Sequence, residues 1–197
     1  SDSQLNSTFD AINDSAQYLS KTIDDFRYFF NPLNSKLSEF EISDTISKSL
    51  KLIESQFRSK DIRIVKNIQS YVLLSIENEL IQVLINIFNN AKDILITKNK
   101  EKRLILINTY QKDSHFYIEI KDSAGGIPED IIDRIFEPYF TTKEMGTGLG
   151  LYISKMIMTK SLRGNIEYED SRYRSNEKEY KGSSFILNLS DIDWWIF

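Results

Sequence analysis

Glycines crowd one part of this chain, and glycine is the residue that best lets backbone amides meet a ligand. Five of the seven glycines lie between Gly125 and Gly150, and none precedes Gly125. Residues 146–151, GTGLGL, run into an apolar helical pattern, so their N–H groups and the positive end of a helix dipole would face a bound anion. We therefore predict a phosphate site in this glycine loop. It matches neither the Walker A loop nor the dinucleotide-binding fingerprint.

Two asparagines share one face of an otherwise apolar helical segment. Asn86 and Asn90 are four residues apart, which places them one above the other. Asparagine is a mediocre helix former, so the pair needs an explanation. An amide oxygen is a hard ligand suited to Mg²⁺, which needs only one or two protein oxygens. The alternative is that the two amides cap a neighbouring loop.

A carboxylate ends a predicted strand just before the first glycine cluster. Asp122 is followed by Ser123, Ala124 and then Gly125-Gly126, a sequence of small residues that forms a tight turn. A carboxylate at this position could accept a hydrogen bond from an exocyclic amino group such as adenine N6, and the glycines would let the base approach. The alternative is an ordinary aspartate turn.

An aromatic, hydroxylated and basic segment joins the two glycine clusters. Residues 135–143, IFEPYFTTK, could form a lid whose aromatic side chains pack down while Thr142 or Lys143 meets phosphate. The alternative is a well-packed connecting loop. We refer to residues 135–143 as the lid segment.

The elements that must position these groups follow from hydrophobic periodicity. We expect a helix capped by Ser43 or Asp44, a long helix over residues 77–96, a short helix over 128–135 and one from the glycine loop to Lys160. Strands are expected at 40–42, near 62–64, and at 71–74, 103–110, 115–121, 164–168 and 183–189. This order predicts an α+β fold, a two-layer sandwich with helices on one face of a mixed, largely antiparallel sheet.

The first thirty residues follow a different rule. Apolar residues recur with spacings of 4, 3, 4, 3, 4, 3 and 4 from Leu5 to Phe30, which is a heptad pattern. Pro32 ends the helix, because the residue before proline is pushed out of the α region. The pattern favours a coiled-coil or bundle helix that pairs with other helices, from a second chain. The alternative is an amphipathic helix packed on its own domain.

Composition excludes several classes of protein. The 197 residues are 41% hydrophobic and include no cysteine, so a disulfide scaffold, a cysteine zinc site and thiol catalysis are excluded. The net charge of −4, without a basic stripe, argues against nucleic-acid binding. No apolar run is long enough to predict a membrane span. The chain begins with serine, and we expect it to be part of a longer protein.

Taken in order, the asparagine helix, the Asp122 turn, the lid segment and GTGLGL are far more specific than any one of them. Residues 40–189 resemble the catalytic, ATP-binding domain of bacterial sensor histidine kinases, within the wider family of gyrase, Hsp90 and MutL. Residues 17–27 resemble the second helix of their dimerisation and phosphotransfer region. The resemblance implies a partial phosphotransfer helix in residues 1–31 and a catalytic domain in 32–197. It also implies ATP and Mg²⁺ as cofactors, a homodimer, a response regulator receiver domain as partner and a cytoplasmic location.

The resemblance also assigns roles to individual residues. Asn90 would bind Mg²⁺, Asn86 would lie near the same phosphates, and Asp93 would hold a magnesium-bound water. Asp122 would bind adenine N6, with Gly126 and Ile127 against the base. Thr142 and Lys143 would belong to the lid. The phosphates would be cradled by Gly146, Thr147, Gly148, Leu149, Gly150 and Leu151. One departure is Ala124, which stands where the family has a glycine, although Gly125 could compensate.

Two features bear on the reaction. The related ATPases place a glutamate one turn before the metal asparagine as a base for water, and the amide of Asn86 cannot take that proton. The only histidine, His115, begins a predicted strand and lacks the helical, acidic context of a phosphate acceptor. We therefore expect a histidine kinase whose acceptor histidine is absent from this chain. An ATPase-type conformational machine and a nucleotide-binding pseudokinase module are the alternatives.

Overall fold

The computed structural model describes residues 36–98, 103–113, 115–143, 146–175 and 178–191. The heptad helix predicted for residues 1–31 and the Trp-rich end of the chain lie outside the described residues. Within the described ranges, no helix combines the length and the apolar composition needed to cross a membrane.

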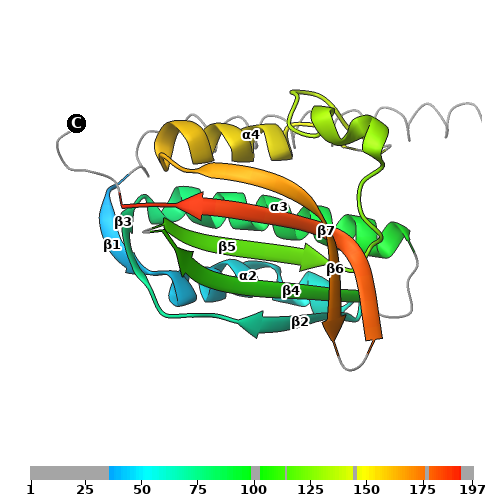
Figure 1. Cartoon of the computed structure of the whole chain (residues 1–197), viewed down its shortest axis with the longest axis horizontal. Coiled ribbons are helices and arrows are strands. Elements are labelled where there is room, and N and C mark those ends of the chain that lie inside the picture. The colour runs from blue at the N-terminus through cyan, green and yellow to red at the C-terminus, as the bar shows by residue number, and fades with distance from the viewer. Residues whose placement is uncertain (1–35, 99–102, 114, 144–145, 176–177, 192–197) are drawn as a thin grey trace, which may run out of the picture.

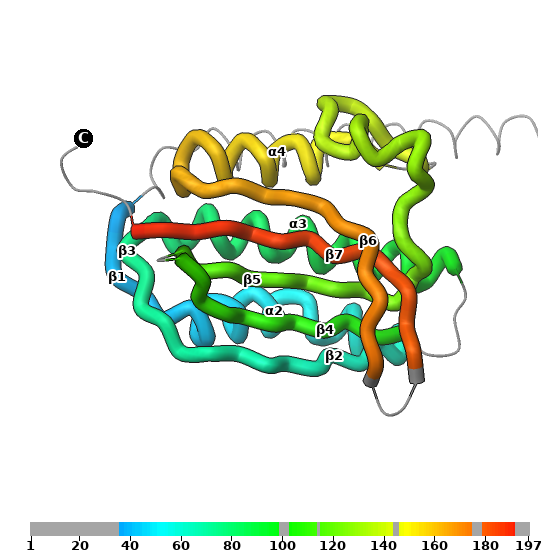
Figure 2. The backbone as a smooth tube through the Cα atoms, in the orientation of Figure 1, coloured from blue at the N-terminus to red at the C-terminus, as the bar shows by residue number. Residues whose placement is uncertain are grey.

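The main sheet has five strands, and it is mixed and largely antiparallel, as predicted. Its order is β2-β4-β5-β7-β6 (Figures 1 and 2). Only β2 and β4 run parallel, and the other neighbours are antiparallel. The strands are β2 (Ile62–Asn67), β4 (Arg103–Lys112), β5 (His115–Asp122), β6 (Asn165–Ser175) and β7 (Lys178–Leu189).

The helices cover one face of this sheet, which confirms the predicted two-layer fold (Figure 1). They are α2 (Ile42–Arg58), α3 (Glu77–Thr97) and α4 (Gly150–Met156), and α4 continues as a π-helical turn, η3 (Ile157–Ser161). Ile105 and Ile107 of β4 and Ile118 of β5 are fully buried, because their side chains alternate toward the helices. On the helical side, Leu84, Ile87 and Phe88 of α3 are equally buried. This core holds α3 rigidly in the centre of the layer, and α3 carries both predicted asparagines.

A small second sheet supports the start of α2. Strand β1 (Ser38–Glu41) pairs antiparallel with β3 (Val72–Ser75). The predicted cap of α2 by Ser43 or Asp44 is wrong, since the helix begins at Ile42 and Glu41 occupies the N-cap position. The Glu41 side chain is longer than that of serine or aspartate, and its Oε1 accepts from two backbone N–H groups, those of Ser43 at 3.5 Å and Tyr71 at 2.8 Å.

The β6–β7 hairpin is much longer than the sequence pattern predicts. Strand β5 pairs with β7 only as far as the Lys121–Ser184 pair, whereas β6 and β7 stay paired to Ser175 and Lys178. The distal half bends away from the direction of the other strands (Figure 1), and Gly182 of β7 lies against Asp122 at the end of β5. Its two-stranded extension lacks a regular apolar alternation, which is why the prediction ended it early. A second difference is that the predicted short helix is a 3-10 helix, η2 (Glu129–Arg134).

Candidate functional site

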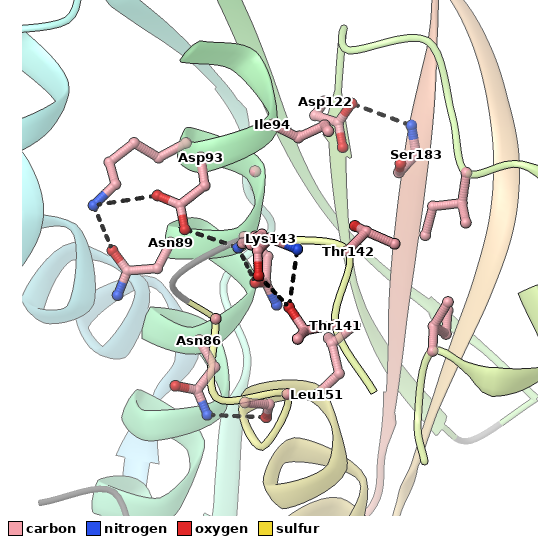
Figure 3. A pocket seen from close by; sticks show the side chains of 18 of the residues that line it. Asn86, Asn89, Asp93, Ile94, Asp122, Thr141, Thr142, Lys143, Leu151 and Ser183 are labelled. Atoms are coloured by element: carbon pink, nitrogen blue, oxygen red, sulfur yellow. Dashed lines mark hydrogen bonds and ion pairs between the residues drawn. The ribbon is translucent and has the colours of Figure 1, made fainter. Parts of the chain in front are cut away.

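One cavity of about 760 Å³ brings the four predicted motifs together. Its wall is formed by α3, the turn after β5, the lid segment, the glycine loop and β7 (Figure 3). All the predicted site residues line it except Leu149. The Leu149 side chain instead packs against the hydrophobic core. The cavity therefore gathers residues that are far apart in the sequence, from Gln56 of α2 to Phe185 of β7.

At one end of the cavity, two oxygens of α3 hold a cation from the lid segment. The ammonium group of Lys143 lies 2.9 Å from Asn90 Oδ1 and 2.8 Å from Asp93 Oδ2 (Figure 3). Asn90 and Asp93 are three residues apart, so α3 presents them on one face. An amide oxygen and a carboxylate oxygen that converge on a positive charge are hard donors of the kind that Mg²⁺ takes. The residues present therefore fit a magnesium ion, with the lysine ammonium standing in its place.

Asn86 has a different role in this structure. Its amide nitrogen donates to the Gly150 carbonyl and to Ser154 Oγ, both at 3.3 Å. Ser154 Oγ also donates to the Gly150 carbonyl at 2.9 Å. The amide thus ties α3 to the first turn of α4. Asn86 therefore contacts the end of the glycine loop and α4, whereas Asn90 contacts the ammonium group of Lys143.

The glycine loop crosses the lid segment at very short range. A Cβ atom on Gly148 would lie 2.4 Å from the carbonyl carbon of Tyr139, and Gly148 has a φ of +67°. Both facts require glycine, because a side chain would collide with backbone and L residues rarely adopt that φ. The lid segment and the glycine loop therefore meet through their backbones.

At the other end of the cavity, Asp122 is almost completely buried, with 3% of its surface exposed. Its Oδ1 accepts hydrogen bonds from Ala124 N at 2.7 Å and Ser183 N at 3.3 Å, which fix the carboxylate in place. A Cβ atom on Gly182 would lie 1.8 Å from the Asp122 carbonyl oxygen, so β7 presses directly on the turn. Ala124 causes no distortion, because Gly125 and Gly126 adopt the positive φ values of +99° and +87°.

Several residues of the cavity were not predicted from the sequence. Ser183 and Phe185 of β7 line it beside Asp122, although the sequence indicates only a strand there. The small-residue segment Gly182-Ser183-Ser184 was the available signal. On α3, Lys92 lies 3.1 Å from Asn89 Oδ1 and 2.6 Å from Gln56 Oε1 of α2. That contact joins two helices, so nothing in the local spacing could indicate it.

His115 lies apart from this arrangement. It is exposed at the start of β5 and is not among the described residues that line the cavity. Its Nδ1 is 2.9 Å from the Asp113 carbonyl oxygen. This agrees with the interpretation of His115 as a surface side chain.

Comparisons with known proteins agree with this geometry. The chain is 31% identical to the sensor protein FixL of Bradyrhizobium diazoefficiens over 112 residues, which are 57% of this chain and 20% of FixL. It is 29% identical to the sensor histidine kinase ZraS of Escherichia coli over 176 residues, which are 88% of this chain and 35% of ZraS. The chain therefore spans about a fifth of FixL and about a third of ZraS.

Solved structures give the same result. The catalytic domain of the histidine kinase ThkA has a TM-score of 0.65 and 28% identity, and the match covers 79% of this chain and 96% of that domain. ThkA has also been solved in complex with the response regulator protein TrrA, with a TM-score of 0.69 at 22% identity, over 92% of this chain and 50% of that chain. The family model of histidine kinase-, DNA gyrase B- and HSP90-like ATPases matches residues 75–191, more than half of the sequence. The chain belongs to this family, as the order of its motifs predicted.

Proposed function

We propose that this chain binds ATP with Mg²⁺ and acts as the catalytic region of a sensor histidine kinase. The observation that carries the proposal is a single cavity with a cation-binding end at Asn90 and Asp93 and a buried carboxylate, Asp122, at the other end. That polarity suits a nucleotide, which has a charged phosphate end and a neutral base. The names of the relatives support the same class of activity.

Different residues of the cavity would bind the base, the metal ion and the phosphates of ATP. Asp122, held by two backbone N–H groups, accepts a hydrogen bond from the adenine amino group, with Gly126 and Ile127 against the base. Asn90 would hold Mg²⁺ and Asp93 would hold one of its waters, and the metal would neutralise phosphate charge when bound. Lys143 and Thr142 of the lid segment, together with the amides of residues 146–151, contact the phosphates. Leu149 takes part only through its backbone, since its side chain packs on the core.

The same site is poorly equipped to activate water. An amide at position 86 has no basic group that could deprotonate water, and its nitrogen donates to Gly150 and Ser154. This favours transfer of the γ-phosphate to a separate acceptor over hydrolysis, and argues against an ATPase-type machine. His115 is exposed and does not line the cavity, so we infer that the acceptor histidine lies outside this chain.

Other parts of the proposal concern the whole protein. Residues 1–31 would be part of the dimerisation and phosphotransfer region, with residues 32–197 as the catalytic domain. The heptad spacing supports self-association as a homodimer. A response regulator receiver domain would receive the phosphate, by analogy with ThkA and TrrA. The location would be cytoplasmic, where ATP and a receiver domain are available.

A nucleotide titration tests the first step. The chain should bind ATP more tightly with Mg²⁺ than with a chelator, and Asn90→Ala should abolish this difference while retaining metal-free binding. Phosphotransfer is then measured with labelled ATP and a separately supplied helical hairpin that carries an acceptor histidine. Label on the hairpin and none on His115 is expected. Failure to bind ATP, or label on His115, would contradict the proposal.

A further inference from the structure

The β6–β7 hairpin is hydrogen-bonded to the turn that carries the predicted adenine contacts. Three hydrogen bonds join the hairpin to this adenine-side turn, residues 122–127. Gly125 N donates to the Lys181 carbonyl at 3.0 Å, and Ser183 N donates to Asp122 Oδ1 at 3.3 Å. The third joins Ile127 N to the Tyr168 hydroxyl at 2.9 Å. This third contact comes from a side chain of the hairpin, whereas the other two use its backbone groups.

Tyr168 is fixed on both sides of its hydroxyl group. The oxygen accepts from Ile127 N and the proton is donated to Asp170 Oδ1 at 2.5 Å. The ring packs edge-on against Phe185, with centroids 5.8 Å apart. Burial, and after it the hydrogen bond to Asp170, raise the pKa of Tyr168 to about 12. The phenol therefore keeps its proton, and remains a donor to Asp170, throughout the neutral range.

The Asp170 carboxylate also packs against this turn, at Gly126. A Cβ atom on Gly126 would lie 2.8 Å from Asp170 Oδ1 and 3.6 Å from the Tyr168 oxygen. Both polar groups thus pack against the backbone of Gly126, on the residue predicted to lie against the base. The cavity lining includes Gly126 and Ile127 but neither Tyr168 nor Asp170. The pair therefore acts on the site through the turn and not by touching a ligand.

We propose that Tyr168 and Asp170 are positioning residues for the nucleotide base, because they set the place of Gly126 and Ile127 relative to Asp122. The inference rests on the proposed function, in which this end of the cavity takes adenine. If it is correct, a substitution that disrupts the Tyr168–Asp170 pair weakens the binding of every adenine nucleotide by the same factor, with or without Mg²⁺. A loss at the phosphate end would instead depend on the number of phosphates and on the metal.

The substitution Tyr168→Phe removes the hydroxyl group and keeps the ring in the core. Tyr173→Phe is the matched control in the same strand, since the buried Tyr173 hydroxyl has no hydrogen-bond partner among the described residues. We expect Tyr168→Phe to weaken ATP and ADP binding alike, by about fivefold, the usual effect of one hydrogen bond. Tyr173→Phe should bind as the unsubstituted chain does. Both affinities are measured with and without Mg²⁺, well below the melting temperature of each variant.

A second pair of variants tests Asp170, which is exposed and so tolerates substitution. Asp170→Asn keeps an acceptor for the phenol and should retain most of the affinity, whereas Asp170→Ala should lose about as much as Tyr168→Phe. Equal binding by Tyr168→Phe and Tyr173→Phe, or a loss confined to ATP with Mg²⁺, would overturn the positioning role alone. If the unsubstituted chain binds neither ATP nor ADP, the proposed function fails and the positioning role fails with it.

Discussion

The ammonium group of Lys143 lies 2.9 Å from the amide oxygen of Asn90, so the lid segment directly contacts the residue predicted to bind magnesium. The lysine also neutralises Asp93, at 2.8 Å. In this arrangement a protein cation contacts the two oxygens that would hold the proposed metal ion. Binding of ATP with Mg²⁺ would therefore exchange one cation for another, and Lys143 would become available to the phosphates.

This exchange of cations predicts that Lys143→Ala lowers the affinity for ATP with Mg²⁺ but leaves the stability of the folded chain nearly unchanged. The Lys143 and Asp93 side chains are about 40% exposed, and ion pairs of that kind contribute at most about 1 kcal/mol to folding. The variant should unfold within about 1 kcal/mol of the unsubstituted chain. It should bind ATP with Mg²⁺ about tenfold more weakly, because a hydrogen bond to a charged phosphate is worth about 1.5–3 kcal/mol.

The measurement is calorimetric titration beside chemical denaturation. Lys66→Ala, an exposed lysine on β2, is the control and should change neither quantity. An unchanged ATP affinity in Lys143→Ala would contradict the phosphate contact.

Asn86→Glu tests whether the missing base limits hydrolysis. Basal ATP hydrolysis should stay the same or rise, since a carboxylate can take a proton from water and an amide cannot. Stability should fall by about 1–3 kcal/mol, because a carboxylate cannot donate to the Gly150 carbonyl and Ser154 Oγ. Phosphate release and thermal unfolding measure the two effects.

Asn86→Gln retains an amide and serves as the control for hydrolysis. A large drop in basal hydrolysis in Asn86→Glu, beyond any drop in Asn86→Gln, would count against the argument.

The fold and most of the cavity could be predicted because their signals are local. Asn86 and Asn90 share a helix face by spacing alone, and alternating isoleucines at 105, 107, 118 and 120 mark strands with one buried face. The glycine loop is visible because glycine is otherwise rare in this chain. Each of these features depends on residues within a few positions of one another.

What could not be predicted depends on tertiary contacts. Tyr168 and Ile127 are 41 residues apart, and only the pairing of β7 with β5 and β6 brings them together. The distal hairpin is polar and carries no period that distinguishes it from a loop, so the sequence pattern does not predict its length. Spacing predicts the shared face of Asn86 and Asn90 but not the partner of Asn86 on the next helix.

Gly182→Ala should be strongly destabilising, although Gly182 lies in a polar part of β7. The added Cβ atom would lie 1.8 Å from the Asp122 carbonyl oxygen, which is backbone and cannot move aside without displacing the turn. Overpacking of this kind costs about 1–3 kcal/mol or more. ATP affinity should fall as well, because Asp122 moves with its backbone.

Gly150→Ala is the matched control, since nothing lies within 4 Å of its Cβ position. It should be neutral or stabilise the chain by up to about 1 kcal/mol in chemical denaturation. Equal stability of the two alanine variants would show that β7 does not press on the turn.

The Glu41 carboxylate predicts a stability difference that depends on pH. The Tyr71 N–H, 2.8 Å from Oε1, lowers the pKa of Glu41 in the folded chain, with further help from Ser70 and Ser43. A lowered folded pKa means that the stabilisation is complete above the unfolded pKa, about 4.3, and is lost as the pH falls through the folded pKa. Glu41→Gln should therefore be less stable than the unsubstituted chain at pH 7, by about 1 kcal/mol or less for this partly exposed helix cap.

The difference between the two chains should shrink as the pH falls below about 4.3, because a protonated Glu41 is as neutral as glutamine. Urea denaturation at a series of pH values between 7 and 3 measures it. Glu39→Gln, an exposed position on the same strand, controls for the general loss of negative charge. A difference that grew as the pH fell would contradict the sign of the pKa shift, and an equal difference in Glu39→Gln would assign the effect to net charge instead of the helix cap.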